Sequence, residues 1–118
     1  SSETGTYFEK GVQVWTCGGQ YGTAMMAFSV LYNYLADGTR IIADPSVLML
    51  RPYIGISSYE EYEDYVKYVE NLLPVYTADE IMHTIHYFNE ETSVATFEEY
   101  AVNYSIADVA ARHGDLID

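Results

Sequence analysis

The sequence has few basic residues and a single cysteine, and both scarcities limit what the protein can do. Five lysines and arginines stand against 18 aspartates and glutamates, which gives a formal net charge of −13. A chain with so little positive charge has no basic surface for direct binding of nucleic acid or of an anionic membrane. The expected partners are therefore basic proteins or cations.

Cys17 is the only cysteine, so no disulfide can form within the chain and packing alone must hold the core. A free thiol favours an intracellular location, but localisation stays open because the chain begins at Ser1 and any targeting segment is out of view. The longest apolar stretch, residues 22–36, is interrupted by Ser29 and Asn33 and is shorter than the roughly 20 residues of a membrane span. It predicts a buried helix, and no membrane partner is expected.

Apolar and aromatic residues are abundant, at 49% and 15% of the 118 residues. This composition excludes intrinsic disorder and predicts one compact domain over residues 1–118. The expected fold class is mainly α with α+β character, consisting of four or five helices and a small β element near the N-terminus. Residues 1–10 are expected to be flexible or to lie at an edge.

Local patterns predict the elements of the first half. Residues 12–16 alternate with period two and are rich in β-branched and aromatic side chains, which predicts a short strand. After a glycine-rich turn, a helix is expected over residues 23–36, because Gly38 suits the left-handed residue that ends a helix. Ile41 and Ile42 suggest a second strand. Residues 45–50 suggest a short helix, with a strand over 47–50 as the alternative.

Three helix starts of the form Ser/Thr-x-x-Glu occur in the second half, at Ser58, Thr77 and Thr96. In this pattern the hydroxyl and the glutamate satisfy the first free N–H groups of a helix. The starts are 19 residues apart and predict three capped helices within residues 58–113. An old helical repeat and three ordinary capped helices are both consistent with this spacing.

Most of the negative charge lies in residues 58–99, which carry eleven acids and one base. A helix beginning near Ser58 would place tyrosines and apolar residues on one half and carboxylates on the other. Tyrosine buries its ring while its hydroxyl seeks a polar partner, which suits a surface that another protein partly covers. The expected partner-binding residues are Tyr59, Glu60, Tyr62, Glu63, Asp64, Tyr65, Tyr68, Glu70, Asp79, Glu90 and Glu91.

These features predict a non-enzymatic acidic domain that binds a basic protein surface. In the sharper version of this hypothesis, carboxylates about 5–6 Å apart on a helix imitate phosphates, and the protein inhibits a nucleic-acid-binding protein. In the other version the chain is a structural accessory subunit of a larger complex. Homo-oligomer formation is compatible with both versions, and no cofactor is expected.

The glycine-rich segment 17–22 suggests an enzymatic alternative. Its Cys17-Gly18 pair, followed by a helix that contains Ala24 and Met25, resembles the bacteriocin-processing type of papain-like cysteine peptidases, in which such a pair opens the central helix. The resemblance implies a Cys17-dependent hydrolase. No histidine opens a later hydrophobic strand, however, so catalytic residues are not predicted. A phosphate-binding turn is also not favoured, because no lysine follows Gly22.

A metal site is the remaining alternative. In an unbroken helix over residues 77–95, one narrow arc would hold Asp79, His83, His86 and Glu90. The central three could donate to zinc, but a complete site would need ligands from another helix. The sequence therefore predicts a solvated polar face at this position rather than a bound metal ion.

Overall fold

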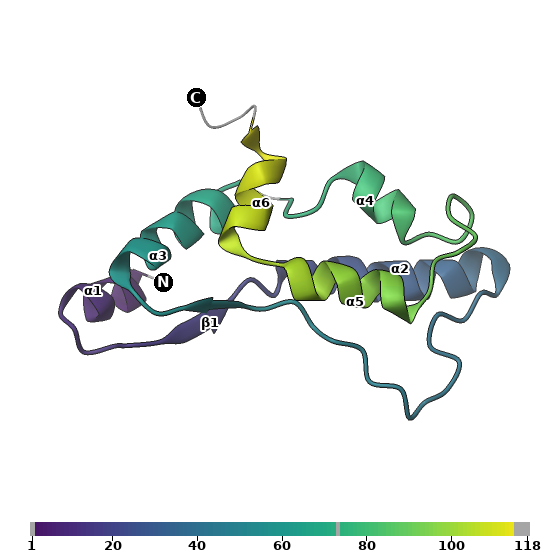
Figure 1. Cartoon of the computed structure of the whole chain (residues 1–118), viewed down its shortest axis with the longest axis horizontal. Coiled ribbons are helices and arrows are strands. Elements are labelled where there is room, and N and C mark those ends of the chain that lie inside the picture. Colours follow the sequence, from purple (N-terminus) through teal and green to yellow (C-terminus); the bar gives the residue numbers. More distant parts are fainter. Residues whose placement is uncertain (1, 73, 115–118) are drawn as a thin grey trace.

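A computed structural model describes residues 2–72 and 74–114 of the chain (Figure 1). Within these residues, six α-helices, a π-helical segment and a two-stranded antiparallel sheet form a mainly α protein of the α+β class, as predicted. The helices outnumber the four or five expected. The molecule is elongated, with dimensions of 51 × 36 × 19 Å and a radius of gyration of 16.3 Å.

The first helix, α1 (Ser2–Glu9), replaces the flexible or edge segment expected at the N-terminus. It packs against α3 (Tyr59–Tyr65), where the rings of Phe8 and Tyr62 lie 6.0 Å apart. The backbone of α1 approaches the Tyr62 ring closely at Gly5. A Cβ atom at this position would lie 2.8 Å from the ring. The contact with α3 therefore positions α1.

The sheet consists of β1 (Thr16–Gly18) and β2 (Ile54–Ile56). They pair antiparallel, with Thr16 opposite Ile56 and Gly18 opposite Ile54. The strand predicted over residues 12–16 is therefore wrong except at Thr16, since β2 supplies partners only for residues 16–18. The second strand suggested at Ile41 and Ile42 does not form either, and its place is taken by β2.

The turn after β1 is closely packed around Gly19, whose φ is +81°. The Gly19 N–H donates to the Tyr65 hydroxyl at 2.8 Å, and the Tyr104 hydroxyl donates to the Gly19 carbonyl at 2.9 Å. A Cβ atom at Gly18 would lie 2.6 Å from the Tyr65 hydroxyl oxygen. The glycine-rich segment thus serves as a packing site for two tyrosines.

The longest helix, α2 (Tyr21–Asp37), confirms the helix predicted over residues 23–36. It ends at Gly38, which has a φ of +78° and whose N–H donates to the Tyr34 carbonyl at 2.9 Å. The prediction that this helix is buried is wrong for one of its faces. Ser29 and Asn33 are buried, whereas Phe28 is 55% exposed.

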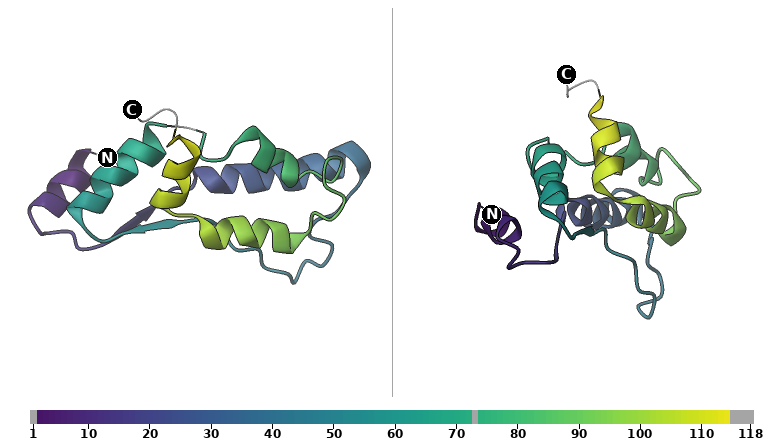
Figure 2. Two further views of the ribbon diagram at one scale, coloured as in Figure 1. Left: turned by 45° about the horizontal axis from the view of Figure 1, so that its top comes forward. Right: turned by 60° about the vertical axis from the view of Figure 1, so that its left-hand side comes forward.

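A long irregular loop, residues 39–53, connects α2 to β2 and extends away from the helices (Figure 2). Neither the short helix expected over residues 45–50 nor the alternative strand over 47–50 forms. Asp44 closes only a turn, accepting hydrogen bonds from the backbone N–H and hydroxyl of Ser46 at 2.8 and 2.7 Å. Leu48, in the middle of the loop, is 87% exposed.

Within its described residues, the second half contains four α-helices rather than three. After α3 come the π-helical segment η1 (Val66–Glu70), α4 (Ala78–His83), α5 (Val94–Asn103) and α6 (Ile106–Arg112). Ser58 and Thr77 cap α3 and α4 as predicted, but α5 begins after Ser93 rather than Thr96. The regular 19-residue spacing is therefore not a structural repeat.

The core lies where α2, the α3–η1 helix, α5 and α6 meet the sheet. Figures 1 and 2 show α5 running alongside α2, with α6 between α3 and α4. The most deeply buried residues of the core come from most of these elements. They include Met26, Ile56, Val69, Tyr76, Phe97 and Val109. This core holds the acidic helix at one end of the molecule.

Candidate functional site

The acidic helix predicted after Ser58 forms as α3 and continues as η1. The Ser58 hydroxyl accepts the N–H of Glu61 at 3.1 Å. The Glu61 carboxylate in turn accepts the N–H and the hydroxyl of Ser57 at 2.6 and 2.8 Å, and these hydrogen bonds lower the pKa of Glu61. Glu61 therefore helps to hold the helix start.

Tyr65, one of the expected contact residues, points into the core. It is 6% exposed, its hydroxyl accepts the Gly19 N–H, and burial raises the pKa of that hydroxyl. It is consequently unavailable to a partner. The predicted contact residues of this helix that are exposed or half-buried are called the α3–η1 surface below. They are Tyr59, Glu60, Tyr62, Glu63, Asp64, Tyr68 and Glu70, and Tyr62 is half-buried because its ring packs against Phe8 of α1.

A hollow of about 470 Å³ lies along one side of this surface. The charge of Glu63, and more weakly that of Glu9 on α1, raises the pKa of the Tyr59 hydroxyl. The hollow therefore combines aromatic rings with a negative field. Its lining comprises Tyr59, Tyr62, Glu63, Val66, Lys67, Glu70 and Asn71.

A second hollow, of about 450 Å³, lies between α3, β2 and α6. It too combines carboxylates, from Glu61 and Asp64, with aromatic rings, from Tyr53 and Tyr68. At its Tyr68 side, the Lys67 Nζ lies 4.6 Å from the centre of the Tyr68 ring and 3.0 Å from the hydroxyl. One ring of the surface thus already holds a cation in the geometry of a cation–π contact.

The remaining predicted contact residues lie elsewhere. Asp79 is on α4, while Glu90 and Glu91 lie in the segment 84–93. Figures 1 and 2 show α3 toward one end of the molecule and the segment 84–93 at the other. The structure therefore does not bring all eleven predicted residues together on one face.

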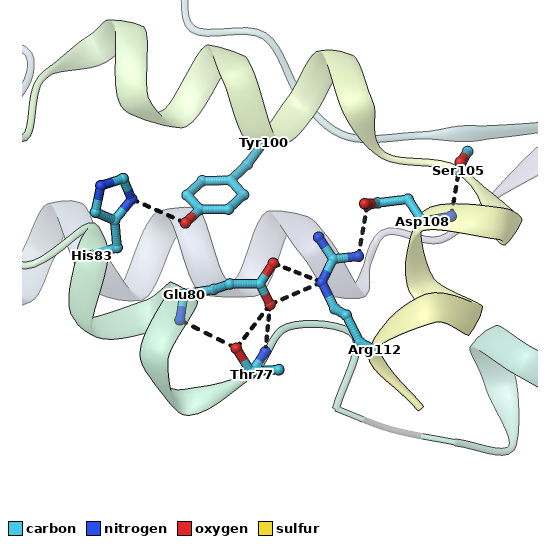
Figure 3. Close-up of polar contacts among 7 residues, drawn as sticks. All are labelled: Thr77, Glu80, His83, Tyr100, Ser105, Asp108 and Arg112. Atoms are coloured by element: carbon cyan, nitrogen blue, oxygen red, sulfur yellow. Dashed lines mark hydrogen bonds and ion pairs between the residues drawn. The ribbon is translucent and has the colours of Figure 1, made fainter. Parts of the chain in front are cut away.

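Glu80, a further acid of the middle segment, is engaged internally (Figure 3). Its carboxylate accepts the N–H of Thr77 at 2.8 Å and lies 2.7 Å from Nε of Arg112. Arg112 also contacts Asp108 at 2.6 Å and stacks over the Tyr76 ring at 4.8 Å. This network joins α4 to α6, so its charges are not available to a partner.

The helix required by the metal hypothesis is interrupted, because α4 ends at His83. His83 Nδ1 lies 3.0 Å from the Tyr100 hydroxyl (Figure 3), and His86 Nδ1 lies 2.9 Å from Asp37. The two imidazoles thus have different partners. Within residues 2–72 and 74–114, no group of three or more histidine, cysteine, aspartate or glutamate side chains is arranged to hold a metal ion.

The cysteine-peptidase resemblance requires a cysteine at the start of the central helix, and Cys17 lies elsewhere. It occupies the middle of β1, opposite Gly55, and is exposed, while α2 begins four residues later at Tyr21. The ring of His83 contacts Tyr100, and the ring of His86 contacts Asp37 rather than Cys17.

The exposed face of α2 was not predicted from the sequence. Phe28, Leu31 and Leu35 are 55%, 58% and 72% exposed. A signal was present, since Ser29 and Asn33 are four residues apart and share one helical face. The other face of this apolar stretch could thus have been identified as the outward one.

None of the described helices is both long enough and apolar enough to cross a membrane. No protein-family model, curated protein or solved structure matches the chain.

Proposed function

We propose that this protein is a non-enzymatic interaction domain that binds a basic segment of another protein through its α3–η1 surface. The observation that carries the proposal is the pair of hollows on either side of one helix. Each hollow combines tyrosine rings with carboxylates, which are Glu63 and Glu70 on one side and Glu61 and Asp64 on the other.

Each component of this surface has a role in such binding. The carboxylates attract a cationic partner from a distance and raise the rate of association. The tyrosine rings offer apolar area for the methylene stems of lysine or arginine, and cation–π contacts for their charged ends. Lys67 on Tyr68 shows the second contact within the chain itself.

The sharper form of the proposal is that the surface imitates nucleic acid. Carboxylates one helical turn apart are about 5–6 Å from one another, which is of the same order as the phosphate spacing of a strand. Glu60, Glu63 and Asp64 present such a spacing on α3. A groove that normally binds a nucleic-acid backbone is then the preferred partner site.

The test is a titration of the full chain with a lysine- and arginine-rich peptide, followed by heteronuclear NMR. We expect changes in the backbone chemical shifts that are centred on α3 and η1. The triple variant Glu63→Gln, Asp64→Asn, Glu70→Gln should weaken binding about tenfold at low salt, since three partly exposed charge pairs contribute about 0.5 kcal/mol each.

The matched control is Asp79→Asn, Glu90→Gln, Glu91→Gln, which removes the same charge away from α3. It should weaken binding only slightly, through the general field of the protein. Equal weakening by both triple variants would contradict a defined site. A natural complex that withstands high salt would support the accessory-subunit alternative.

A further inference from the structure

Helix α2 carries apolar side chains on both its buried and its exposed side. Its core-facing side combines Met25 and Met26, which are 7% and 2% exposed, with Ser29 and Asn33, which are 0% and 1% exposed. The Asn33 side chain donates to the Thr84 carbonyl at 2.9 Å and accepts the His86 N–H at 2.7 Å. The buried side of α2 is thus fixed by apolar and polar contacts, while further apolar side chains of the same helix face outward.

The outward side chains form a regular stripe. Ala24, Phe28, Leu31 and Leu35 follow one another at intervals of four, three and four residues, the spacing of a helix–helix seam. All four are exposed, and Leu35 reaches 72%. Asp37, at the C-terminal end, is the only charged residue of α2. The stripe is therefore an uncharged surface on a strongly acidic protein.

The molecule exposes more surface than a compact monomer of its mass, enough to include an interface of ordinary size. The chain exposes 7484 Å², whereas a compact monomer of this mass exposes about 6,500 Å². Its radius of gyration of 16.3 Å likewise exceeds the roughly 13–14 Å of a compact 118-residue domain. The excess, about 1,000 Å², is similar to the about 800 Å² that each partner contributes to a stable interface.

We propose that the occupant is a second copy of this chain, bound through antiparallel pairing of the two α2 helices. A two-fold axis midway between Phe28 and Leu31 places Phe28 opposite Leu31 of the second copy. The same axis places Ala24 opposite Leu35. The small residue thus meets a large one at each end of the stripe, and the sequence is complementary to itself.

A hollow beside the stripe supports this pairing. It has a volume of about 370 Å³ and lies where the N-terminal half of α2 faces residues 74–81. Ala24 and Phe28 form part of its wall, so Leu35 of the second copy lies at its opening in the antiparallel arrangement. The side chains that line it are Tyr21, Ala24, Met25, Phe28, Pro74, Val75, Tyr76 and Ile81.

Charge favours a second copy over the basic partner proposed for the α3–η1 surface. A basic segment would find no carboxylate along residues 22–36 to neutralise it. Two copies of the stripe, by contrast, bring no charged groups together there. The two surfaces are thus suited to different partners.

The first test is sedimentation equilibrium of the full chain at several concentrations. We expect a monomer–dimer equilibrium in which Leu31→Asp weakens dimerisation at least tenfold. The matched control is Val102→Asp, because Val102 is also apolar, is 70% exposed and lies on another helix, α5. Circular dichroism establishes that both variants are folded. A protein that stays monomeric, or a dimer insensitive to Leu31→Asp, would overturn the proposal.

Cross-linking tests the orientation, and its result stands even if Leu31→Asp does not fold. Cys17 is first replaced by serine, which leaves a chain without cysteine. Under mild oxidation, the double variant Ala24→Cys, Leu35→Cys should form a disulfide-linked dimer, and each single variant should not. Linkage of the single variants would indicate parallel helices, and no linkage in any variant would contradict the interface.

Discussion

Gly19 is held through both of its backbone polar groups by side chains distant in sequence. Its N–H is bound by Tyr65 of α3, and its carbonyl by Tyr104, which connects α5 to α6. The absence of a side chain at Gly18 allows the Tyr65 hydroxyl to lie close to the backbone there. The connection between β1 and α2 is thereby fixed to two distant parts of the chain.

Removal of one of these hydroxyls should destabilise the fold. In Tyr65→Phe the buried Gly19 N–H loses its partner, and an unpaired buried donor costs about 1–3 kcal/mol. The free energy of unfolding, measured by urea denaturation, should fall by that amount. In the control Tyr59→Phe the hydroxyl is lost from a ring that is 39% exposed, so stability should change by less than about 0.5 kcal/mol. Equal stability of the two variants would contradict the arrangement around Gly19.

Asp37, at the end of α2, makes stability depend on pH. Hydrogen bonds from Thr39, and then from His86, lower its pKa from 3.8 to about 2. Because folding favours the carboxylate, its stabilisation is complete above pH 3.8 and is lost as the pH falls toward about 2.

The variant Asp37→Asn should therefore flatten the decrease in the urea midpoint between pH 3.8 and about 2. Glu91→Gln serves as the control, because Glu91 is exposed and lies in a turn outside the helices. A decrease identical in Asp37→Asn and the unmodified protein would show that Asp37 is not a source of the acid sensitivity.

The helices of the second half illustrate how contacts with other elements override local preference. The helix that begins at Thr77 ends at His83, because α2 binds the next turn. The Thr84 hydroxyl lies 2.7 Å from that of Ser29, and its carbonyl accepts the Asn33 amide. The Thr84 carbonyl thus has its hydrogen-bond partner on α2 rather than on a following turn of the same helix.

Helix α6 is attached to α4 through Arg112, which lies between Glu80 and Asp108 (Figure 3). Its side chain is 11% exposed, so Arg112→Met leaves two partly buried carboxylates without a counter-charge. We expect a loss of about 2 kcal/mol in the free energy of unfolding, measured by urea denaturation.

Arg51→Met is the matched control, because Arg51 is an exposed residue of the loop 39–53. It should change stability by less than about 0.5 kcal/mol. Arg112→Lys should recover only part of the loss, since an ammonium group does not bridge both carboxylates in the same planar geometry. Full stability in Arg112→Met would contradict a structural role for this network.

Features with local causes were predictable from the sequence. Gly38 and the caps at Ser58 and Thr77 fixed three helix boundaries, since such signals act within a few residues. The start of α5 was misplaced because Ser93 lies three residues before Thr96 and is itself a capping residue.

Features that depend on distant contacts were not predictable. The pairing of β1 with β2 joins residues that are 36 positions apart at Gly18↔Ile54 and 40 positions apart at Thr16↔Ile56. Helical periodicity predicted the outward carboxylates of the candidate surface, but it did not separate the buried Tyr65 from the exposed Tyr59. That difference depends on distant contacts, such as the hydrogen bond between Tyr65 and Gly19. The separation of Glu90 and Glu91 from α3 depends on the whole fold.

The molecule has two chemically different surfaces, and their response to salt should differ in sign. Binding of a cationic peptide at α3–η1 should weaken as salt rises, because its attraction is screened. Dimerisation through α2 should instead strengthen, because salt reduces repulsion between copies that each carry a net charge of −13.

Parallel salt series of the peptide titration and of sedimentation equilibrium check this prediction. Leu31→Asp, which is expected to weaken dimerisation at least tenfold, should leave the salt dependence of peptide binding unchanged. If salt moved both equilibria in the same direction, the assignment of separate charged and apolar surfaces would be contradicted.

The loop 39–53 is anchored at its ends and open in its middle. Ile41 and Pro52 are buried, while Leu48 is 87% exposed. On either side of this loop, the pairing of β1 with β2 and the bond from Asn33 to Thr84 connect the preceding residues to the following ones. A protease that cuts between Ser46 and Leu48 would thus release neither half, and the nicked chain would keep its fold as a complex of two fragments.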